Sequence, residues 1–382
     1  MRDPIYLDHN ATTPLLSEAL DAMLPYLRGK YGNPSSQHAY GRAAKEAVET
    51  ARAQVAAFLG AQPEEIVFTS CGTESNNLAI RGAVEARPER THLVTSNVEH
   101  PAVANVCAML ERRGHRVTRA KVGPSGRVTA EDVVAAFADD TLLVSVMHAN
   151  NETGAIQPVA EIGRAAREKG ILVHTDAAQS AGKVPVDVGE LSVDLLTLAA
   201  HKLYGPKGVG ALYIRKGVKI APFAIGAGHE RGMRPGTENV ASLVGFGVAC
   251  AAAQRDAEWL HELLGFLRDR LWNKLRELVP GVALNGGEDP RVPSTLNVRF
   301  PKVAGPALLA ATPEIAASTG AACHDGADVA SAGILALGVP AEEAIGSVRF
   351  SVGRATQDAE IDRAAEAIAA SWRRLTGEPR GE

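Results

Sequence analysis

The sequence predicts an α/β protein with a mostly parallel central sheet flanked by helices, joined to a smaller α+β domain. Short apolar runs rich in β-branched residues alternate with longer amphipathic stretches from about residue 40 to residue 214. Such alternation is typical of strand–helix repeats that form a sheet covered on both faces. Ala and Gly are plentiful and aromatic residues make up only 4% of the chain. This composition favours close helix–sheet contacts over an all-β fold.

The repeating part of the chain predicts six strands and five helices. The strands are short and bounded by Gly, Asn, Asp or Pro; we expect them over residues 66–70, 92–96, 142–147, 171–175, 195–198 and 209–214. The helices have amphipathic patterns, and we expect them over residues 42–59, 74–84, 101–113, 131–138 and 159–169.

The pattern changes after about residue 238. A long Ala- and Leu-rich helical stretch runs to about residue 278, followed by strand-like segments at 294–300 and 347–352 and a final helix to about residue 375. A chain of 382 residues has room for two domains. We expect a large domain over residues 15–255 and a small domain built from residues 1–14 plus 256–382, which carries the segment around Cys323.

Composition excludes several classes of function. A net charge of −4 gives no reason to expect nucleic-acid binding. The four cysteines are scattered without a CxxC pair, which argues against a disulfide framework or a metal cluster. The start of the chain has no signal-peptide pattern, and no apolar run approaches the length of a membrane span. We therefore expect a cytoplasmic protein that binds neither membrane nor metal.

Polar residues gather where the predicted strands end, the edge at which α/β sheets bind ligands. Lys202 follows one strand in HKLYGPKG, before a Gly/Pro turn. A desolvated lysine there could form a Schiff base; a surface loop lysine is the ordinary alternative, and Lys207 is the competing candidate.

Asp176 in HTDAAQS ends another strand, where it is either a helix N-cap or the partner of a protonated pyridine nitrogen. The combination of Asp176 and Lys202 favours pyridoxal phosphate (PLP).

Other segments add candidates for binding this cofactor. Thr73 in SCGTESNN opens a predicted helix, and a helix N-terminus is suited to a phosphate, although an ordinary Thr N-cap is the alternative. His100 precedes Pro101 and could stack on a flat ring, although a structural histidine is the ordinary alternative. Asn151 offers an amide, and Thr237 precedes a helix as a candidate for a second phosphate contact.

Two segments near the C-terminus suggest how a substrate is handled. Cys323 lies among Gly, Ala and Ser with His324 beside it, which indicates an exposed thiol with an enhanced thiolate fraction. Arg349 lies in an alternating strand and could bind a carboxylate bidentately. Arg354 is the alternative for that role, and a surface salt bridge is the ordinary interpretation of both.

Together these segments closely resemble the cysteine desulfurases of the class V aminotransferase family, which have PLP fold type I. The resemblance covers nearly the whole chain and is carried by YLDHNATTP, GNPSS, TSCGTESNN, VEHPAV, MHANNETG, HTDAAQ, HKLYGPKGVGALYIR, ERGMRPGTENV, GAACH and SVRFSVGR. Chance agreement over so many motifs is implausible.

The resemblance implies a role for each matched residue. Lys202 matches the Schiff-base lysine, Asp176 the pyridinium partner, and His100 the ring-stacking acid/base residue. The remaining matches are Gly72, Thr73 and His201 to the phosphate, Asn151 and Gln179 to the phenolic oxygen, Thr237 to the phosphate of a neighbouring subunit, Cys323 to the persulfide-forming nucleophile, Arg349 to the substrate carboxylate and Asn33 to the vicinity of the substrate. The match of Thr237 implies a homodimer.

The implied reaction removes sulfur from L-cysteine, giving L-alanine and a persulfide that passes to an acceptor protein such as an iron–sulfur scaffold or a thiolation relay. Two departures bear on it. Ala199 stands where many relatives carry a phosphate-binding Ser, and STGAACHDG is also similar to selenocysteine lyases. L-selenocysteine therefore remains an alternative substrate; a class V transaminase and a non-catalytic scaffold are further alternatives.

Overall fold

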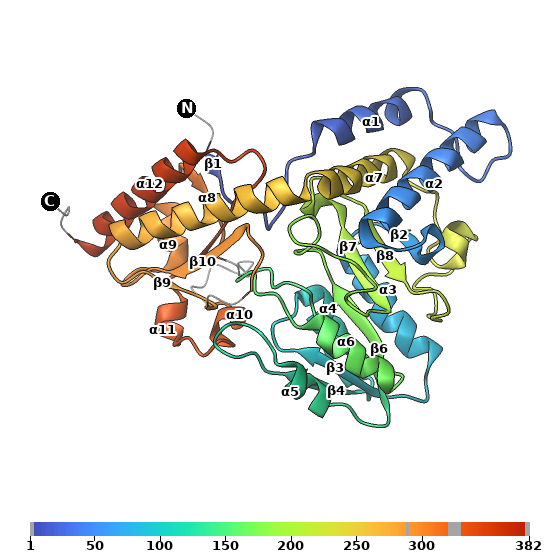
Figure 1. Ribbon diagram of the computed structural model, residues 1–382, viewed down its shortest axis with the longest axis horizontal. Coiled ribbons are helices and arrows are strands. Elements are labelled where there is room, and N and C mark those ends of the chain that lie inside the picture. The colour runs from blue at the N-terminus through green and yellow to red at the C-terminus, as the bar shows by residue number, and fades with distance from the viewer. Residues whose placement is uncertain (1–3, 288–289, 320–329, 379–382) are drawn as a thin grey trace.

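The computed structural model describes residues 4–287, 290–319 and 330–378. Figure 1 shows two lobes joined along one side by the long helices α7 (Val240–Arg255) and α8 (Ala257–Leu278). The larger lobe holds the central sheet. In the smaller lobe, strand β1 (Ile5–Tyr6) lies among the C-terminal elements, so the two ends of the chain meet there.

The central sheet has seven strands in the order β2-β8-β7-β6-β5-β3-β4. Strand β8 runs antiparallel to both its neighbours, and the other pairings are parallel. The predicted mostly parallel sheet is thus confirmed. The strands are β2 (Ile66–Thr69), β3 (His92–Ser96), β4 (Arg116–Ala120), β5 (Thr141–Ser145), β6 (Leu172–Asp176), β7 (Leu195–Ala199) and β8 (Gly210–Ile214).

Successive side chains along each strand alternate between two apolar layers. Leu172 belongs to the apolar cluster that includes residues of α3 (Gly72–Ala86) and α4 (Pro101–Arg112), whereas the next residue, Val173, belongs to the cluster that includes residues of α2 (Ala39–Leu59), α6 (Val159–Glu168) and α7. This alternation follows from the two-residue repeat of a strand, so both faces of the sheet are covered. The helices of the large lobe are α1 (Ser17–Arg28), α2 (Ala39–Leu59), α3 (Gly72–Ala86), α4 (Pro101–Arg112), α5 (Ala130–Ala135), α6 (Val159–Glu168) and α7.

The smaller lobe has a separate apolar core, in which Ile5 and Leu7 pack with residues between Leu260 and Trp372. Strand β10 (Thr295–Arg299) lies between β12 (Ser347–Ser351) and β9 (Ala283–Leu284) in an antiparallel sheet, and β1 pairs with β11 (Ile315–Ala316). Helices α9 (Gly305–Ala310), α10 (Ala332–Leu335), α11 (Ala341–Ala344) and α12 (Asp358–Thr376) complete it. We propose that the predicted domain limits, 15–255 against 1–14 plus 256–382, follow this division of the core.

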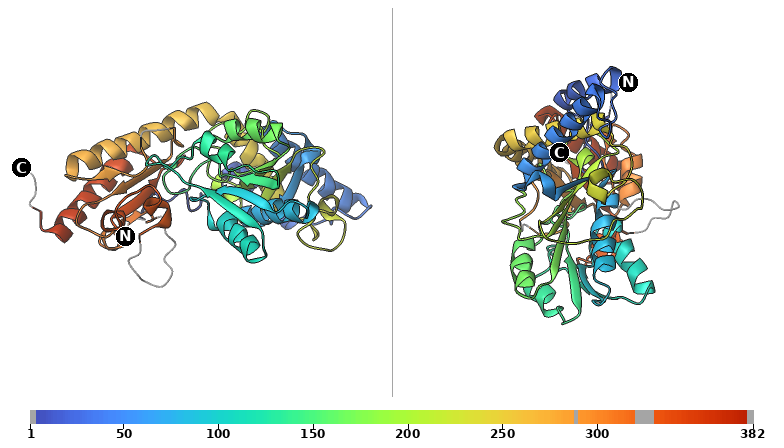
Figure 2. Two further views of the ribbon diagram at one scale, coloured as in Figure 1. Left: turned by 90° about the horizontal axis from the view of Figure 1, so that it is seen from below. Right: turned by 90° about the vertical axis from the view of Figure 1, so that its right-hand side faces the viewer.

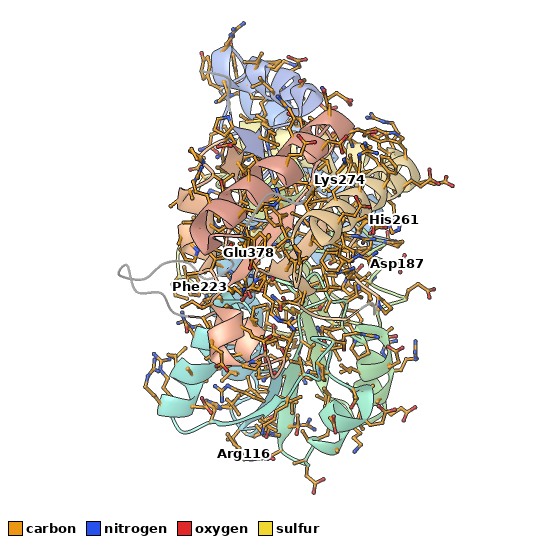
Figure 3. The ribbon with its side chains drawn as sticks, turned by 90° about the vertical axis from the view of Figure 1, so that its left-hand side faces the viewer. Arg116, Asp187, Phe223, His261, Lys274 and Glu378 are labelled. Carbon is orange, nitrogen blue, oxygen red and sulfur yellow. The ribbon has the colours of Figure 1, made fainter. Side chains whose placement is uncertain are left out.

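The C-terminal helices α8 and α12 pack side by side on one flank. Lys274 of α8, labelled in Figure 3, pairs with Asp362 of α12 at 3.4 Å, and Arg270 bonds the same carboxylate at 2.7 and 2.8 Å. Figure 2 shows these helices at the end of the elongated molecule opposite α1 and α2. This pair of helices therefore forms the outer wall of the smaller lobe.

Three of the differences between the structure and the sequence prediction have a clear physical reason. The single helical stretch expected over 238–278 is two helices, because Asp256 ends α7 and begins α8 with φ near −101° and ψ near 9°. Strand β4 was not predicted, since an edge strand bearing Arg116 and Arg119 lacks the apolar run of a central strand. Helix α1 was also not predicted; it carries Pro25, a residue that disfavours helix interiors.

The buried face of α8 gives a test of the smaller core. Leu267 is fully buried, whereas Phe266 beside it is 51% exposed. We expect Leu267→Ala to lower the free energy of unfolding by about 2–5 kcal/mol, because it removes buried carbons and leaves a cavity. Phe266→Ala, the matched control, should change it far less. Urea unfolding monitored by circular dichroism measures both, and equal losses in the two variants would contradict the assigned packing.

Candidate active site

A cavity of about 250 Å³ lies at the carboxyl ends of the parallel strands. It brings together residues from five separate segments of the sequence. Eight of the predicted site residues line it: Gly72, Thr73, His100, Asn151, Asp176, Gln179, His201 and Lys202. Polar residues that the sequence places at the ends of separate strands therefore meet in one cavity, at the edge where α/β sheets bind ligands.

Lys202 ends the short 3-10 helix Ala200–Lys202, which follows β7 directly. Its Nζ donates to the carbonyl oxygens of Asn10, at 2.5 Å, and Ala11, at 2.9 Å. Burial, reinforced by the positive charge of Arg349, lowers the pKa of Lys202 to about 8. Lys207, the competing candidate, is exposed and does not line the cavity, so the geometry favours Lys202.

Asp176 is the last residue of β6, and its carboxylate is buried in the cavity wall. Asn76 Nδ2 donates to Oδ2 at 2.7 Å, and the Ala178 backbone N–H donates to Oδ1 at 2.9 Å. The structure has turns rather than a helix after Asp176, so the helix N-cap alternative does not apply. The carboxylate is available to pair with a cationic group of a ligand.

His174 shares a strand face with Asp176 but has a different environment. Its ring bonds Ser145 Oγ at 2.8 Å and Thr197 Oγ1 at 3.2 Å. Burial lowers its pKa to about 4. The neutral imidazole therefore joins strands β5, β6 and β7, two residues before Asp176.

The N-terminus of α3 forms one end of the cavity. The helix begins at Gly72 with Cys71 in the cap position, so Thr73 lies in the first turn and is not the N-cap. First-turn N–H groups have no intrahelical acceptor and favour an anion. A Cβ on Gly72 would lie 3.3 Å from the Cβ of Ala199, so these two small residues let the helix start close against β7.

Two histidines of the cavity are neutral at pH 7. Burial, followed by the charges of Lys202 and Lys207, lowers the pKa of His201 to about 4, and its Nδ1 lies 3.1 Å from Thr12 Oγ1. His100 caps α4, where its Nδ1 accepts the Ala102 backbone N–H at 3.1 Å. Burial lowers the pKa of His100 as well. Because Nδ1 is an acceptor, the proton of His100 lies on Nε2.

Sequence reasoning missed three residues that hold this site. Asn76 supports Asp176, as described above. Lys183 is buried, and its Nζ donates to Gln179 Oε1 at 2.9 Å and to Asn10 Oδ1 at 3.1 Å. Gln179 Nε2 in turn donates to the Asn10 carbonyl oxygen at 2.9 Å. The signal for Asn10 was its place in YLDHNATTP, which entered the prediction only as part of the resemblance.

The remaining predicted residues lie outside the cavity lining. Arg349 is buried beside it and donates to the Asn151 carbonyl oxygen at 2.9 Å and to Asp8 Oδ1 at 2.8 Å. Arg354, the alternative carboxylate binder, is paired with Asp256 at 2.6 Å. Thr237 and Asn33 are exposed in loops away from the cavity, and Cys323 lies outside the described residues.

The other cysteines are free thiols. Cys71 lines the cavity, whereas Cys107 and Cys250 are buried in helices. Burial raises the pKa of Cys107 to about 12 and also raises the pKa of Cys250. Both buried thiols are therefore protonated and unsuited to nucleophilic attack.

Within residues 4–287, 290–319 and 330–378 there is no cluster of three or more His, Cys, Asp or Glu side chains suited to a metal ion. In the same ranges no helix has the length and apolar character needed to cross a membrane.

Comparison with known proteins identifies the family. The profile of the aminotransferase class-V family matches residues 5–364. The chain belongs to the class V aminotransferase family. It is 45% identical over 366 residues to the cysteine desulfurase of Trichormus azollae, covering 95% of this chain and 92% of that protein. It is 46% identical over 381 residues to cysteine desulfurase IscS of Anaeromyxobacter dehalogenans, covering 98% and 94%.

A solved structure of a NifS-like protein superposes with a TM-score of 0.91 at 36% identity, covering 96% of this chain and 98% of that one. This similarity confirms the predicted PLP fold type I.

Class V aminotransferases of this kind depend on PLP, and the cavity fits that cofactor. Lys202 supplies a half-buried amine of lowered pKa for its aldehyde, and Asp176 a buried carboxylate for its pyridine nitrogen. The first turn of α3, with Thr73 and His201, offers donors for its phosphate. Asn76 also lines the cavity, and its Oδ1 is a buried atom without a partner among the described residues, so it can accept a hydrogen bond from a ligand.

The lowered pKa of Lys202 gives a test of this assignment. An amine attacks an aldehyde only in its neutral form, so cofactor-free protein should capture PLP at a rate that rises about tenfold per pH unit below pH 8 and levels off above it. An ordinary lysine would level off near pH 10.4. Stopped-flow absorbance measures the rate between pH 7 and 10. Lys202→Ala is the control and should retain no PLP after borohydride reduction; a wild-type rate still rising tenfold above pH 9 would refute the lowered pKa.

Proposed function

We propose that this chain is a cysteine desulfurase, which removes sulfur from L-cysteine with PLP and yields L-alanine and a persulfide on Cys323. The observation that carries the proposal is the cavity in which Lys202, Asp176 and His100 meet, in a chain about 45% identical to proteins named cysteine desulfurase. Within this cavity Lys202 provides a base, Asp176 a counter-charge and His100 a neutral imidazole.

PLP, when bound, accepts the electron pair left on the substrate Cα. Lys202 would hold the cofactor aldehyde and would act as the base that removes the Cα proton, and its pKa of about 8 leaves a useful neutral fraction at pH 7. Asp176 would hold a proton on the pyridine nitrogen. His100 carries its proton on Nε2 and is suited to move protons over the face of the ring.

The substrate itself is handled by two further residues. Arg349 binds its carboxylate, as the resemblance implies. The Cys323 thiolate attacks the substrate sulfur, so that an S–S bond forms as the C–S bond breaks. The electron pair of the broken bond stays with the carbon fragment, which takes up a proton and leaves as L-alanine. The terminal sulfur then passes to an acceptor protein; an iron–sulfur scaffold and a thiolation relay are the candidates.

Selenocysteine lyase is not favoured, because the relatives reported above are named cysteine desulfurases. A transaminase has no need of a nucleophilic thiol, and a non-catalytic scaffold has no need of a lysine of lowered pKa in the same cavity as a buried carboxylate. Alanine and sulfide or selenide, measured together from L-cysteine and L-selenocysteine, separate these functions. Turnover of selenocysteine with cysteine acting only as an inhibitor would replace the desulfurase by the lyase.

Cys323→Ser tests the nucleophile. Because the serine hydroxyl cannot form a persulfide, sulfur release should fall at least roughly a hundredfold, while the absorbance of bound PLP stays unchanged. Cys71→Ser is the matched control: this cysteine lines the cavity, yet the proposal gives it no part in sulfur transfer, so persulfide labelling should persist. Full activity in Cys323→Ser would favour a transaminase.

We also propose a cytoplasmic homodimer. A cytoplasmic setting suits a thiol nucleophile, because that compartment keeps thiols reduced. The exposed position of Thr237, away from its own chain's cavity, supports a contact with the phosphate bound by a second subunit. Loss of such a charged hydrogen bond in Thr237→Ala should weaken PLP binding roughly ten- to a hundredfold.

Equilibrium dialysis measures the PLP affinity of this variant, and analytical ultracentrifugation measures the oligomeric state. Thr50→Ala, at an exposed threonine bonded within its own helix, should leave the affinity unchanged. A wild-type monomer, or unaltered PLP binding by Thr237→Ala, would count against the shared site.

A further inference from the structure

Arg349 carries a positive charge into a nearly closed environment, where its side chain is 6% exposed. Its Nη2 donates to Asp8 Oδ1 at 2.8 Å and its Nη1 to the Asn151 carbonyl oxygen at 2.9 Å. The Nε atom is buried without a partner among the described residues. The guanidinium is therefore paired with a carboxylate of the protein while its Nε donor is unused.

Asp8 is fixed in this position by the backbone. It forms a parallel bridge with Ser351, the Ser351 N–H donates to the Leu7 carbonyl oxygen at 2.7 Å, and Tyr6 Oη donates to the Asp8 carbonyl oxygen at 3.1 Å. Ser351 follows Arg349 by two residues on β12, so the two charged side chains come from adjacent extended segments. The contact is thus built into the pairing of the N-terminal segment with β12.

Glu152 is the other carboxyl group near Arg349, and it has a different partner. It accepts from Ser331 Oγ at 2.5 Å, and burial raises its pKa. Asp8 is consequently the carboxylate that neutralises Arg349. Both charges act on the cavity: Arg349 lowers the pKa of Lys202, and Asp8 raises it.

We propose that Asp8 is a resident counter-ion that opposes the substrate carboxylate at Arg349 and so limits how tightly amino acids bind. This inference rests on the proposed function, in which Arg349 receives that carboxylate. Between turnovers Asp8 stabilises a buried cation that would otherwise be costly. When an amino acid binds, its carboxylate meets a second negative charge on the same guanidinium, and like charges at this separation repel. The repulsion weakens the binding of substrate and product alike. The product, alanine, therefore dissociates more readily.

Asp8→Asn tests the proposal, because the amide oxygen can still accept from Nη2 while the charge is lost. The dissociation constant of L-alanine is measured by isothermal titration calorimetry on the PLP-loaded protein. We expect alanine to bind roughly tenfold more tightly, and ethylamine, which has the same amine without a carboxylate, to bind as in the wild type. In steady-state assays the KM for L-cysteine should fall by a similar factor without a gain in kcat.

Asp362→Asn is the matched control, since it removes a carboxylate bonded to an arginine, Arg270, at similar distances on the flank of α8 and α12. It should leave alanine affinity unchanged. Asp8→Ser removes the same charge and replaces the asparagine variant in the titration if the latter does not fold.

Unchanged or weaker alanine binding by the folded Asp8 variant would overturn the proposal, and so would equal tightening of alanine and ethylamine. Failure of the proposed function looks different: wild-type protein would release no sulfur from L-cysteine. The alanine titration would still report on Asp8 in that case, because it needs no turnover.

Discussion

Asn10 is a buried residue whose polar atoms all have partners, and the geometry of the site depends on it. Its carbonyl oxygen accepts from both Lys202 and Gln179, while its side chain accepts from Lys183. The remaining donors of Asn10 reach β12 and β10 of the smaller lobe, through Ser351 Oγ and Thr295 Oγ1, and the loop after β5, through the Asn151 carbonyl oxygen. Leaving a buried polar atom unpaired costs about 1–3 kcal/mol. The N-terminal segment, the cavity floor and the smaller lobe are therefore held in one fixed relation.

The network around Asn10 also sets the electrostatics of the cavity. Burial lowers the pKa of Lys183 to about 7 and that of Lys202 to about 8, and both amines bond only neutral oxygens among the described residues. The histidines of the wall are neutral, while Arg349 is matched by Asp8. An enclosure built in this way attracts an anionic ligand, such as a phosphate ester with a phenolic oxygen. It also gives Lys202 a pKa of about 8, so that a fraction of this amine is neutral at pH 7.

The strands and the residues at their ends could be predicted because both have local signals. Asp176 and Lys202 follow short apolar runs, and the carboxyl end of a strand is a position that the sequence itself marks. Lys183 and Asn76 have no such signal: the first lies in a turn region and the second in the interior of a helix, and each acts through a partner that the fold brings close. The contact of Asn76 with Asp176 spans 100 residues and that of Asn10 with Thr295 spans 285. Local periodicity carries no information on such pairs, nor on Thr237, whose proposed partner belongs to another subunit.

The lysine segment is joined to the boundary between the lobes by a second set of contacts. Tyr204, two residues after Lys202, adopts a left-handed φ of 64°, and its hydroxyl accepts the Arg354 backbone N–H at 2.7 Å. The Arg354 guanidinium lies over the Tyr204 ring and bonds Asp256, the residue between α7 and α8. A non-glycine residue in this conformation is held there by its surroundings. The segment that carries Lys202 is therefore attached to the boundary between the lobes by a hydrogen bond, a cation–π contact and an ion pair.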